Sequence, residues 1–222
     1  NVDDANYTGS ATGTLVIAPA TSTVTLGNLA ATYNGSAQAA TFTTDPAGLS
    51  VIVTYEDSTT APTDAGSYAV EANVDDANYT GSATGTLVIA PATSTVTLGN
   101  LASTYDGSPQ AVTVTTDPAG LSVIVTYEDS TTAATDAGSY AVEAVVDDAN
   151  YTGSASGTLV SAPASATVTL GSLASTYDGS PQAFTVTTDP AGLSVIVTYE
   201  DSTTAPTDAG SYAVEAVIDD AN

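Results

Sequence analysis

Apolar and polar residues alternate along a stretch that occurs three times in the chain, at residues 63–76, 135–148 and 207–220. In the first copy every second residue from Tyr68 to Val74 is apolar, and the residues between them are small or polar. A period of two places alternate side chains on opposite faces of a β-strand. The pattern therefore predicts a half-buried strand with Tyr68 and Val74 on its inward face.

Differences among the three copies agree with this assignment. Asn73, at an outward position, is exchanged for valine in the other two copies, Val145 and Val217. Val74, at an inward position, remains an aliphatic β-branched residue in every copy. An outward position tolerates a change of polarity, whereas an inward one keeps its apolar character.

Four further segments of a repeat combine apolar alternation with flanking turn residues. In the first complete repeat they are Thr23–Leu26, Ala39–Thr43, Leu49–Tyr55 and Thr84–Ile89. The second segment presents Ala40 and Phe42 as its inward pair, and the last has another copy at Thr12–Ile17. No window shows an apolar stripe of period 3.6 with capping residues, so the sequence predicts strands and no helix.

The segments between these strands have the composition of turns. Asn34 and Gly35, replaced by Asp-Gly in the other copies, form a dipeptide whose residues tolerate positive φ. Asp45–Gly48 has Asp, Pro and Gly at the positions that a type I turn favours. Ser58–Thr63 is predicted to be a polar loop.

Internal repetition sets the domain organisation. The phrase that ends at Asn6 returns at Asn78, Asn150 and Asn222, in steps of 72 residues. An Ala-Pro-Ala junction recurs with the same period, and proline there cannot donate a hydrogen bond to a strand ladder. We therefore expect 1–19 to be the C-terminal strand of an upstream module, 20–91 and 92–163 to be complete modules, and 164–222 to be a third module without its last strand.

The composition excludes several classes of function. The 222 residues include 25 Asp and Glu but no Lys, Arg or His, which gives a formal charge of −25. Without cations the chain has nothing to bind nucleic acid or an anionic membrane. It has no Cys or Met, which removes disulfides, thiolate nucleophiles and soft-metal sites. A hydrophobic content of 42% is that of a globular chain.

Asp64–Tyr68 resembles the tyrosine corner of immunoglobulin-like sandwiches, in which the phenol bonds back to nearby backbone. Together with the short, regularly spaced strands, this resemblance implies an all-β fold. We expect a tandem array of small Ig-like β-sandwich modules, with β-grasp-like modules as the alternative.

Four motifs, in one order, resemble the MBG/YDG-type repeats of very large bacterial surface adhesins. The motifs are Asn78–Ser82, Tyr105–Gln110, Thr115–Leu121 and Asp136–Tyr140. The first complete repeat departs from the pattern by having Tyr-Asn-Gly in place of Tyr-Asp-Gly. The resemblance implies an extracellular, cell-surface or biofilm-matrix protein in which such modules form a stalk, spacer or filament. It carries no catalytic residues over to this chain.

Catalysis would have to rest on paired carboxylates, because the chain has no His, Cys or Lys. Glu56 and Asp57, or Asp75 and Asp76, are adjacent in sequence, and adjacent residues of a strand point to opposite faces. The sequence therefore predicts a protein that is not an enzyme and that holds no cofactor.

Calcium is a metal that the residue types suit, because its ligands are oxygen atoms. Asp75, Asp76 and Asn78 gather where modules meet, and Asp147, Asp148 and Asn150 repeat them. No EF-hand loop pattern accompanies them. A charged exterior that keeps the protein soluble explains the same residues without any ion.

Two features concern carbohydrate. Asn-Xaa-Thr/Ser sequons occur at Asn6, Asn34, Asn78 and Asn150, although turn chemistry also explains these asparagines. The chain has 12 Tyr, which are able to stack on glycans, but the alternation puts Tyr55 and Tyr68 in the core. A calcium- or glycan-binding surface module is therefore the alternative to a spacer.

Neighbouring repeats, of the same or an identical chain, are the partners we expect. A module of 72 residues buries too little surface to be robust alone, so contacts between modules should add stability. Identical junctions predict a rod that rises about 30–40 Å per module, which small-angle scattering would test. Residues 12–17 should pair with strands outside this chain or lie unpaired, but not within the third module.

Overall fold

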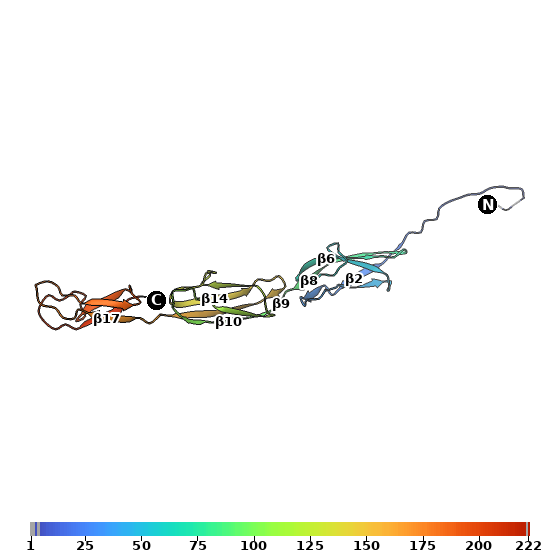
Figure 1. Ribbon diagram of the computed structural model, residues 1–222. Helices are drawn as coiled ribbons and strands as arrows, with labels where there is room; N and C mark the ends of the chain where they lie inside the picture. Colours follow the sequence, from blue (N-terminus) through green and yellow to red (C-terminus); the bar gives the residue numbers. More distant parts are fainter. Residues whose placement is uncertain (1–2, 4, 221) are drawn as a thin grey trace. The chain divides into compact units, whose positions relative to one another are not determined.

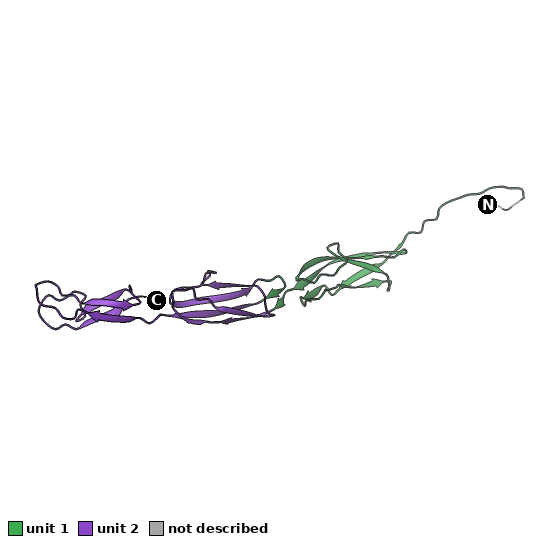
Figure 2. Cartoon of the chain, viewed as in Figure 1, with its two compact units in different colours: residues 1–93, 148–152 green, residues 94–147, 153–222 purple. Residues whose placement is uncertain are grey.

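The computed structural model describes residues 3, 5–220 and 222 (Figure 1). The chain forms two compact units (Figure 2). The first unit comprises the residues up to Thr93 together with 148–152, and the second comprises 94–147 and 153–222. Residues 148–152 belong by sequence to the second complete repeat, so the units do not follow the 72-residue period.

In the first unit a four-stranded sheet has the order β3 (Ala30–Thr32), β8 (Ser82–Ala90), β6 (Gly66–Val74) and β5 (Val51–Tyr55). β3 runs parallel to β8, and the other two pairs are antiparallel. β2 (Thr23–Gly27) pairs antiparallel with β4 (Thr41–Asp45) in a separate sheet. The short strands β1 (Ala20–Thr21) and β7 (Tyr79–Thr80) form a parallel pair.

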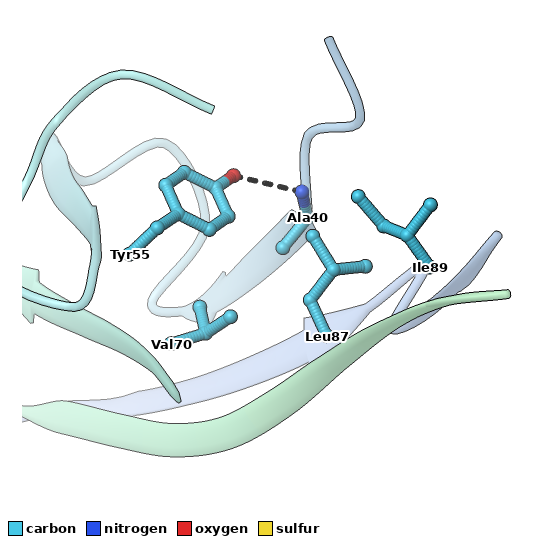
Figure 3. Close-up of a cluster of buried hydrophobic side chains, with 5 residues drawn as sticks. All are labelled: Ala40, Tyr55, Val70, Leu87 and Ile89. Carbon is cyan, nitrogen blue, oxygen red and sulfur yellow. Dashed lines mark hydrogen bonds between the residues drawn. The ribbon is translucent and has the colours of Figure 1, made fainter. Parts of the chain in front are cut away.

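The core of this unit lies between the sheets (Figure 3). Tyr55, Val70, Leu87 and Ile89 of the four-stranded sheet form a buried cluster with Ala40, and Leu26 of β2 packs against the cluster. The Ala40 N–H donates a hydrogen bond of 2.8 Å to the Tyr55 hydroxyl. Because this hydroxyl is buried, its hydrogen bond removes the cost of an unsatisfied polar group.

Two packed sheets with a tyrosine corner are the features of an Ig-like sandwich. The Tyr68 hydroxyl donates to the carbonyl of Asp64 at 3.0 Å, as the sequence predicted. A β-grasp module packs a helix on its sheet, but residues 3, 5–220 and 222 form no helix. The chain is therefore an all-β tandem repeat protein, and the Ig-like arrangement fits it better than the β-grasp alternative.

The second unit repeats the architecture. β11 (Ala102–Thr104), β16 (Ser154–Ala162), β14 (Gly138–Val146) and β13 (Val123–Tyr127) form a four-stranded sheet in that order. β10 (Thr95–Gly99) pairs with β12 (Thr113–Asp117).

The described residues of the third repeat, also in the second unit, form two pairs of strands. β17 (Thr167–Gly171) pairs with β18 (Thr185–Asp189), and β19 (Val195–Tyr199) pairs with β20 (Val214–Ile218). Within the part of the chain described, no strand occupies the place of β3 or β8 in this repeat.

The predicted faces of the central strand are confirmed. Val70 and Ala72 of β6 are 2% and 0% exposed, whereas the outward Val145 and Val217 are 42% and 52% exposed. Glu71 and Asn73 are likewise exposed. The period of two was sufficient to assign both faces because it depends only on the extended backbone.

Two details differ from expectation. β4 begins at Thr41 and β5 at Val51, both two residues later than predicted. Phe42, expected on the inward face, is 39% exposed. The β2–β4 sheet covers only part of the larger sheet, and in the second repeat the equivalent Val114 lines an open cavity of about 370 Å³ beside β13. A side chain at this position therefore points inward without being enclosed.

Residues 12–17 form no strand, and Leu15, Val16 and Ile17 are 81–85% exposed. This segment is therefore not paired with the third repeat of the same chain. No helix in the described residues is long and apolar enough to cross a membrane.

Candidate functional site

A turn held by the tyrosine corner presents backbone and carboxylate groups in the first unit. The hydroxyl of Tyr68 holds the carbonyl of Asp64, and the next residue, Ala65, is half-buried. The bond from Tyr68 uses the backbone carbonyl of Asp64 and not its side chain. The carboxylate of Asp64 and the N–H of Ala65 can therefore bind another group. We call Asp64 and Ala65, and their equivalents in other repeats, the corner turn.

The side chain of Asn150 binds both residues of the corner turn. Its side-chain Oδ1 accepts a hydrogen bond of 2.7 Å from the N–H of Ala65, and its Nδ2 donates one of 3.2 Å to Asp64 Oδ1. An amide side chain carries a donor and an acceptor together, which matches an N–H next to a carboxylate. The bond to a carboxylate is charge-assisted and therefore stronger than a neutral one.

Asn150 is held in position by its own loop. Its N–H donates to Asp148 Oδ1 at 2.8 Å, which closes an Asx turn, and its carbonyl accepts from the N–H of Ala92 at 2.8 Å. The next two residues form β15 (Tyr151–Thr152), which pairs in parallel with β9 (Ala92–Thr93). The backbone of residues 148–152 is thus bound into the first unit.

Aromatic contact adds to these hydrogen bonds. The rings of Tyr33 and Tyr151 meet edge to face, with centroids 5.3 Å apart and an interplanar angle of 78°. Such pairs contribute about 0.5–1.5 kcal/mol beyond their buried area. We call Asn150, Tyr151 and Thr152, and their equivalents, the docking segment.

The same amide contact recurs in the second unit. Oδ1 of Asn222 accepts a hydrogen bond of 3.0 Å from the N–H of Ala137, and the N–H of Asn222 donates to Asp220 Oδ1. Asn150 and Asn222 are half-buried, whereas Asn78 is exposed. The N–H of Asn78 donates to Asp76 Oδ1 and its carbonyl accepts from the N–H of Ala20, the same backbone bonds that Asn150 makes. The amide contact therefore forms in both places where an asparagine of this series follows a corner-turn alanine by 85 residues.

The six residues proposed as calcium ligands have other roles in this geometry. Asp76 and Asp148 each accept the N–H of the asparagine two residues later, and Asn150 binds the corner turn. Asp75 and Asp147 donate their N–H groups to Ser50 and Ser122. The residues described contain no group of three or more His, Cys, Asp or Glu side chains placed to hold a metal ion.

The other acidic pair, Glu56 and Asp57, lies in a turn and not in a strand. Both residues have positive φ, 47° and 67°, and Tyr55 and Ser58 on either side exchange backbone hydrogen bonds of 2.7 and 2.9 Å. The expectation that their side chains alternate across a strand is therefore wrong. Glu56 and Asp57 are the two central residues of a type I′ turn, which requires positive φ at both of them.

The structure also shows where the tyrosines and the sequon asparagine lie that suggested carbohydrate binding or attachment. Tyr55 is 6% exposed and Tyr68 packs against the core, so neither presents a ring face for stacking. The cavity beside β13 is lined by Val, Leu, Ala, Gly and Thr and has no aromatic residue. The Nδ2 atom of Asn150, where a glycan would be attached, donates to Asp64.

The sequence indicated Asn150 as a candidate site residue but did not indicate its contact with the corner turn. The signal was present, because Asp64–Tyr68 and Asn150 both recur in every repeat. What the sequence lacked was their pairing, since Asp64 and Asn150 are 86 residues apart. Because carboxylate and amide oxygens are calcium ligands, the sequence left calcium as an alternative role for Asn150 beside that of a charged exterior.

Comparison with known proteins identifies the repeat. A family model described as "MBG domain" matches residues 1–21, 22–93, 94–165 and 166–222. Searches of curated proteins and of solved structures gave no match.

Proposed function

Because the chain belongs to the MBG domain family, whose repeats are typical of surface-exposed proteins, we propose that it is a structural spacer of an extracellular adhesin or biofilm-matrix protein. In this role its repeats form a stalk or filament and carry out no catalysis. In this role the modules transmit tension along the polypeptide.

The observation that carries the proposal is the capture of residues 148–152 by the first unit. Residues 148–152 belong by sequence to the second complete repeat, but their backbone and the Asn150 amide are bound into the first unit. Backbone bound in this way is less free to move than an open linker. A spacer needs this restriction, because a flexible chain of modules recoils entropically.

The chemistry of the docking segment suits the same role. Asn150 binds through one amide, and β15 binds through backbone hydrogen bonds. These contacts need no metal or cofactor, whose supply depends on the medium outside a cell. An acidic exterior without cations also disfavours adhesion between parallel stalks, because like charges repel.

The spacer role is tested by removing the amide. Asn150→Ala leaves the N–H of Ala65 and the carboxylate of Asp64 without their partner, and two hydrogen bonds contribute about 1–2 kcal/mol. We expect N150A to release residues 148–152 from the first unit, seen by NMR relaxation as faster local motion of these residues. The matched control is Asn78→Ala, at an exposed asparagine that has no corner turn to bind. Equal relaxation in N150A, N78A and the parent protein would refute the role of the contact.

The cellular part of the proposal needs a separate experiment. Brief proteolysis of intact cells that express the natural protein should release peptides of this repeat, identified by mass spectrometry, if the modules stand outside the cell. Their release only after lysis would refute an extracellular location.

A further inference from the structure

One turn of the first complete repeat differs from its counterparts in a single chemical group. Asn34 precedes Gly35 there, whereas the second and third repeats have Asp106 and Asp178 before their glycines. Asparagine loses its side-chain amide most readily when glycine follows, because glycine has no side chain to hinder attack by its backbone nitrogen. The surroundings of Asn34 in the fold decide whether this reaction is suppressed or favoured.

The side-chain carbonyl of Asn34 accepts two hydrogen bonds. Its Oδ1 accepts one of 2.9 Å from the N–H of Ser36 and one of 2.7 Å from Nε2 of Gln38. Gln38 is half-buried and held in place, because its own N–H donates to the carbonyl of Pro62 at 2.8 Å. Two fixed donors on one carbonyl oxygen stabilise the negative charge that forms there when the carbon is attacked, as in an oxyanion hole.

The two nitrogen atoms beside this carbonyl are free to react. Asn34 and Gly35 are both exposed to solvent. Among the described residues, no group accepts a hydrogen bond from Asn34 Nδ2 or from the N–H of Gly35. Gly35 has a φ of 76°, and a Cβ built on it would meet nothing within 4 Å. The attacking nitrogen and the leaving nitrogen are therefore unhindered, while the carbonyl between them is polarised.

The other two repeats show that the product of amide loss fits the turn. Oδ1 of Asp106 accepts from the N–H of Ser108 and from Nε2 of Gln110, both at 2.8 Å. Asp178 accepts the equivalent two bonds at 2.8 and 2.7 Å. Hydrogen bonds to a carboxylate are charge-assisted and stronger than those to an amide oxygen. An aspartate at position 34 would therefore have the same two donors and bind them more strongly than the asparagine does.

We propose that the Asn34–Gly35 turn is a self-modifying site that converts Asn34 to aspartate without an enzyme. The backbone nitrogen of Gly35 loses its proton to a solvent base and forms a bond to Cγ of Asn34. The bond from Cγ to Nδ2 breaks, and Nδ2 leaves as ammonia with a proton from solvent. Water then adds to Cγ of the resulting succinimide ring, and the Gly35 nitrogen leaves Cγ and regains a proton. Water is the one co-reactant, and nothing is oxidised or reduced.

The same two donors direct the opening of the ring. Water that adds to Cγ gives aspartate, whereas water that adds to the backbone carbonyl carbon gives isoaspartate, the main product in unstructured peptides. The N–H of Ser36 and Nε2 of Gln38 bind the oxygen on Cγ and so activate that carbon. Isoaspartate would also lengthen the backbone by one atom and move the carboxylate away from both donors. The folded turn therefore yields aspartate.

The conversion gives all three repeats the same Asp-Gly turn. It adds one negative charge to the formal −25 of the chain. It differs from the loss of an amide in an ordinary loop, because the hydrogen-bond pattern of the turn is kept and its acceptor becomes charged. The turn of the first repeat is therefore strengthened with age and not damaged by it.

The first experiment follows the 222-residue chain during incubation at mildly alkaline pH in water labelled with heavy oxygen. Only amides lost during the incubation acquire the label. Proteolysis and mass spectrometry measure amide loss at Asn34, and electron-transfer fragmentation distinguishes aspartate from isoaspartate. We expect the folded chain to react at least as fast as the same chain in urea. The folded chain should give mainly aspartate, and the chain in urea mainly isoaspartate.

A variant without the side-chain donor tests the role of the turn. Gln38→Met nearly keeps the length of the side chain but removes the 2.7 Å bond to Asn34. We expect Q38M to slow amide loss about two- to tenfold, the range that one hydrogen bond contributes, and to raise the share of isoaspartate. The matched control is Gln110→Met, which removes the equivalent bond in the second repeat and should leave the rate at Asn34 unchanged.

A second variant supplies the product directly and does not depend on the folding of Q38M. Asn34→Asp should unfold at the same temperature as the parent chain or at a higher one, because the other repeats already hold aspartate in this turn. The acidic species that forms from the parent chain, isolated by ion exchange, should have the unfolding midpoint of N34D. A lower midpoint in that species would show that isoaspartate had formed and would overturn the proposal.

The rates and products decide the remaining steps. Amide loss that is as fast in the folded chain as in urea, that yields aspartate and that Q38M slows supports the proposal. Amide loss that is slower in the folded chain overturns it, because the fold then suppresses the reaction. Isoaspartate as the main folded product, or equal rates in folded Q38M and the parent chain, also overturns it, because the two donors then have no part in the reaction.

Discussion

At the scale of single residues, the second repeat differs from the first at one buried and one half-buried position that face each other across β11 and β16. Ser103 and Ser161 are paired there, where the first repeat has Ala31 and Ile89. The hydroxyls of both serines are buried and have no hydrogen-bond partner. A buried hydroxyl without a hydrogen-bond partner costs about 1–3 kcal/mol. The second repeat is therefore less stable at this point than the first.

Replacing this pair should stabilise the second repeat. The double variant Ser103→Ala, Ser161→Ile recreates the combination that the first repeat already accommodates, and we expect the free energy of unfolding to rise by about 2 kcal/mol. Native-state hydrogen exchange of the amides in β14 and β16 measures the change. The reverse exchange, Ile89→Ser in the first repeat, should lower protection in β6 and β8. Faster exchange in the double variant would mean that the second repeat has repacked around the smaller serines.

At the scale of elements, the turn between β5 and β6 is built from unfavourable residues. Glu56 and Asp57 both have positive φ, and the same is true of Glu128 with Asp129 and of Glu200 with Asp201. Residues other than glycine lose about 1–2 kcal/mol in this conformation, although Asp tolerates it better than most. The turn is kept in place by its flanking bonds between Tyr55 and Ser58 and by the N–H of Glu56, which donates to the carbonyl of Ala69.

Asparagine and glycine should therefore stabilise this hairpin. The variant Glu56→Asn, Asp57→Gly supplies the residues that a type I′ turn favours, and we expect a gain of about 1 kcal/mol, or an unfolding midpoint of the first repeat about 4–8 °C higher. Differential scanning calorimetry measures it. Because the variant also removes two charges, the control is Glu71→Gln with Asp75→Asn, which removes two exposed charges without a change in backbone strain. Equal gains in both variants would assign the effect to charge.

At the scale of the whole molecule, 25 carboxylates stand without any Lys, Arg or His to offset them. Like charges repel over about a Debye length, which is about 10 Å in 0.1 M salt. The folded state brings these charges closer together than the unfolded chain does, so the repulsion lowers its stability.

The charge predicts a salt-dependent stability. We expect the thermal unfolding midpoint to rise between 10 mM and 1 M sodium chloride, because screening relieves the repulsion. If the acidic loops at Asp75–Asp76 and Asp147–Asp148 coordinate calcium, millimolar calcium should raise the midpoint further at matched ionic strength. Magnesium at the same concentration is the control, since it is bound less readily by flexible all-protein sites. Midpoints that do not change with salt would show that the carboxylates are already well separated.

The strand faces and the tyrosine corner could be predicted from the sequence by itself, whereas the turn at Glu56 and Asp57 was not. The inward Val70 and the outward Val145 followed from a period of two, and the bond from Tyr68 to Asp64 spans only four residues. Such features depend on the extended backbone and on close neighbours, which a short stretch of sequence contains in full. Repetition with a step of 72 residues then extended each assignment to every copy.

The tertiary structure alone decided which repeated elements meet. A period of two is the same in parallel and antiparallel pairs, so it did not reveal that β3 runs parallel to β8. The exposure of Phe42 depends on how much of the larger sheet the smaller one covers. The contact of Asn150 with Asp64 and Ala65 joins residues about one repeat apart. Local pattern has no information about such distant pairs, because the folding of everything between them brings them together.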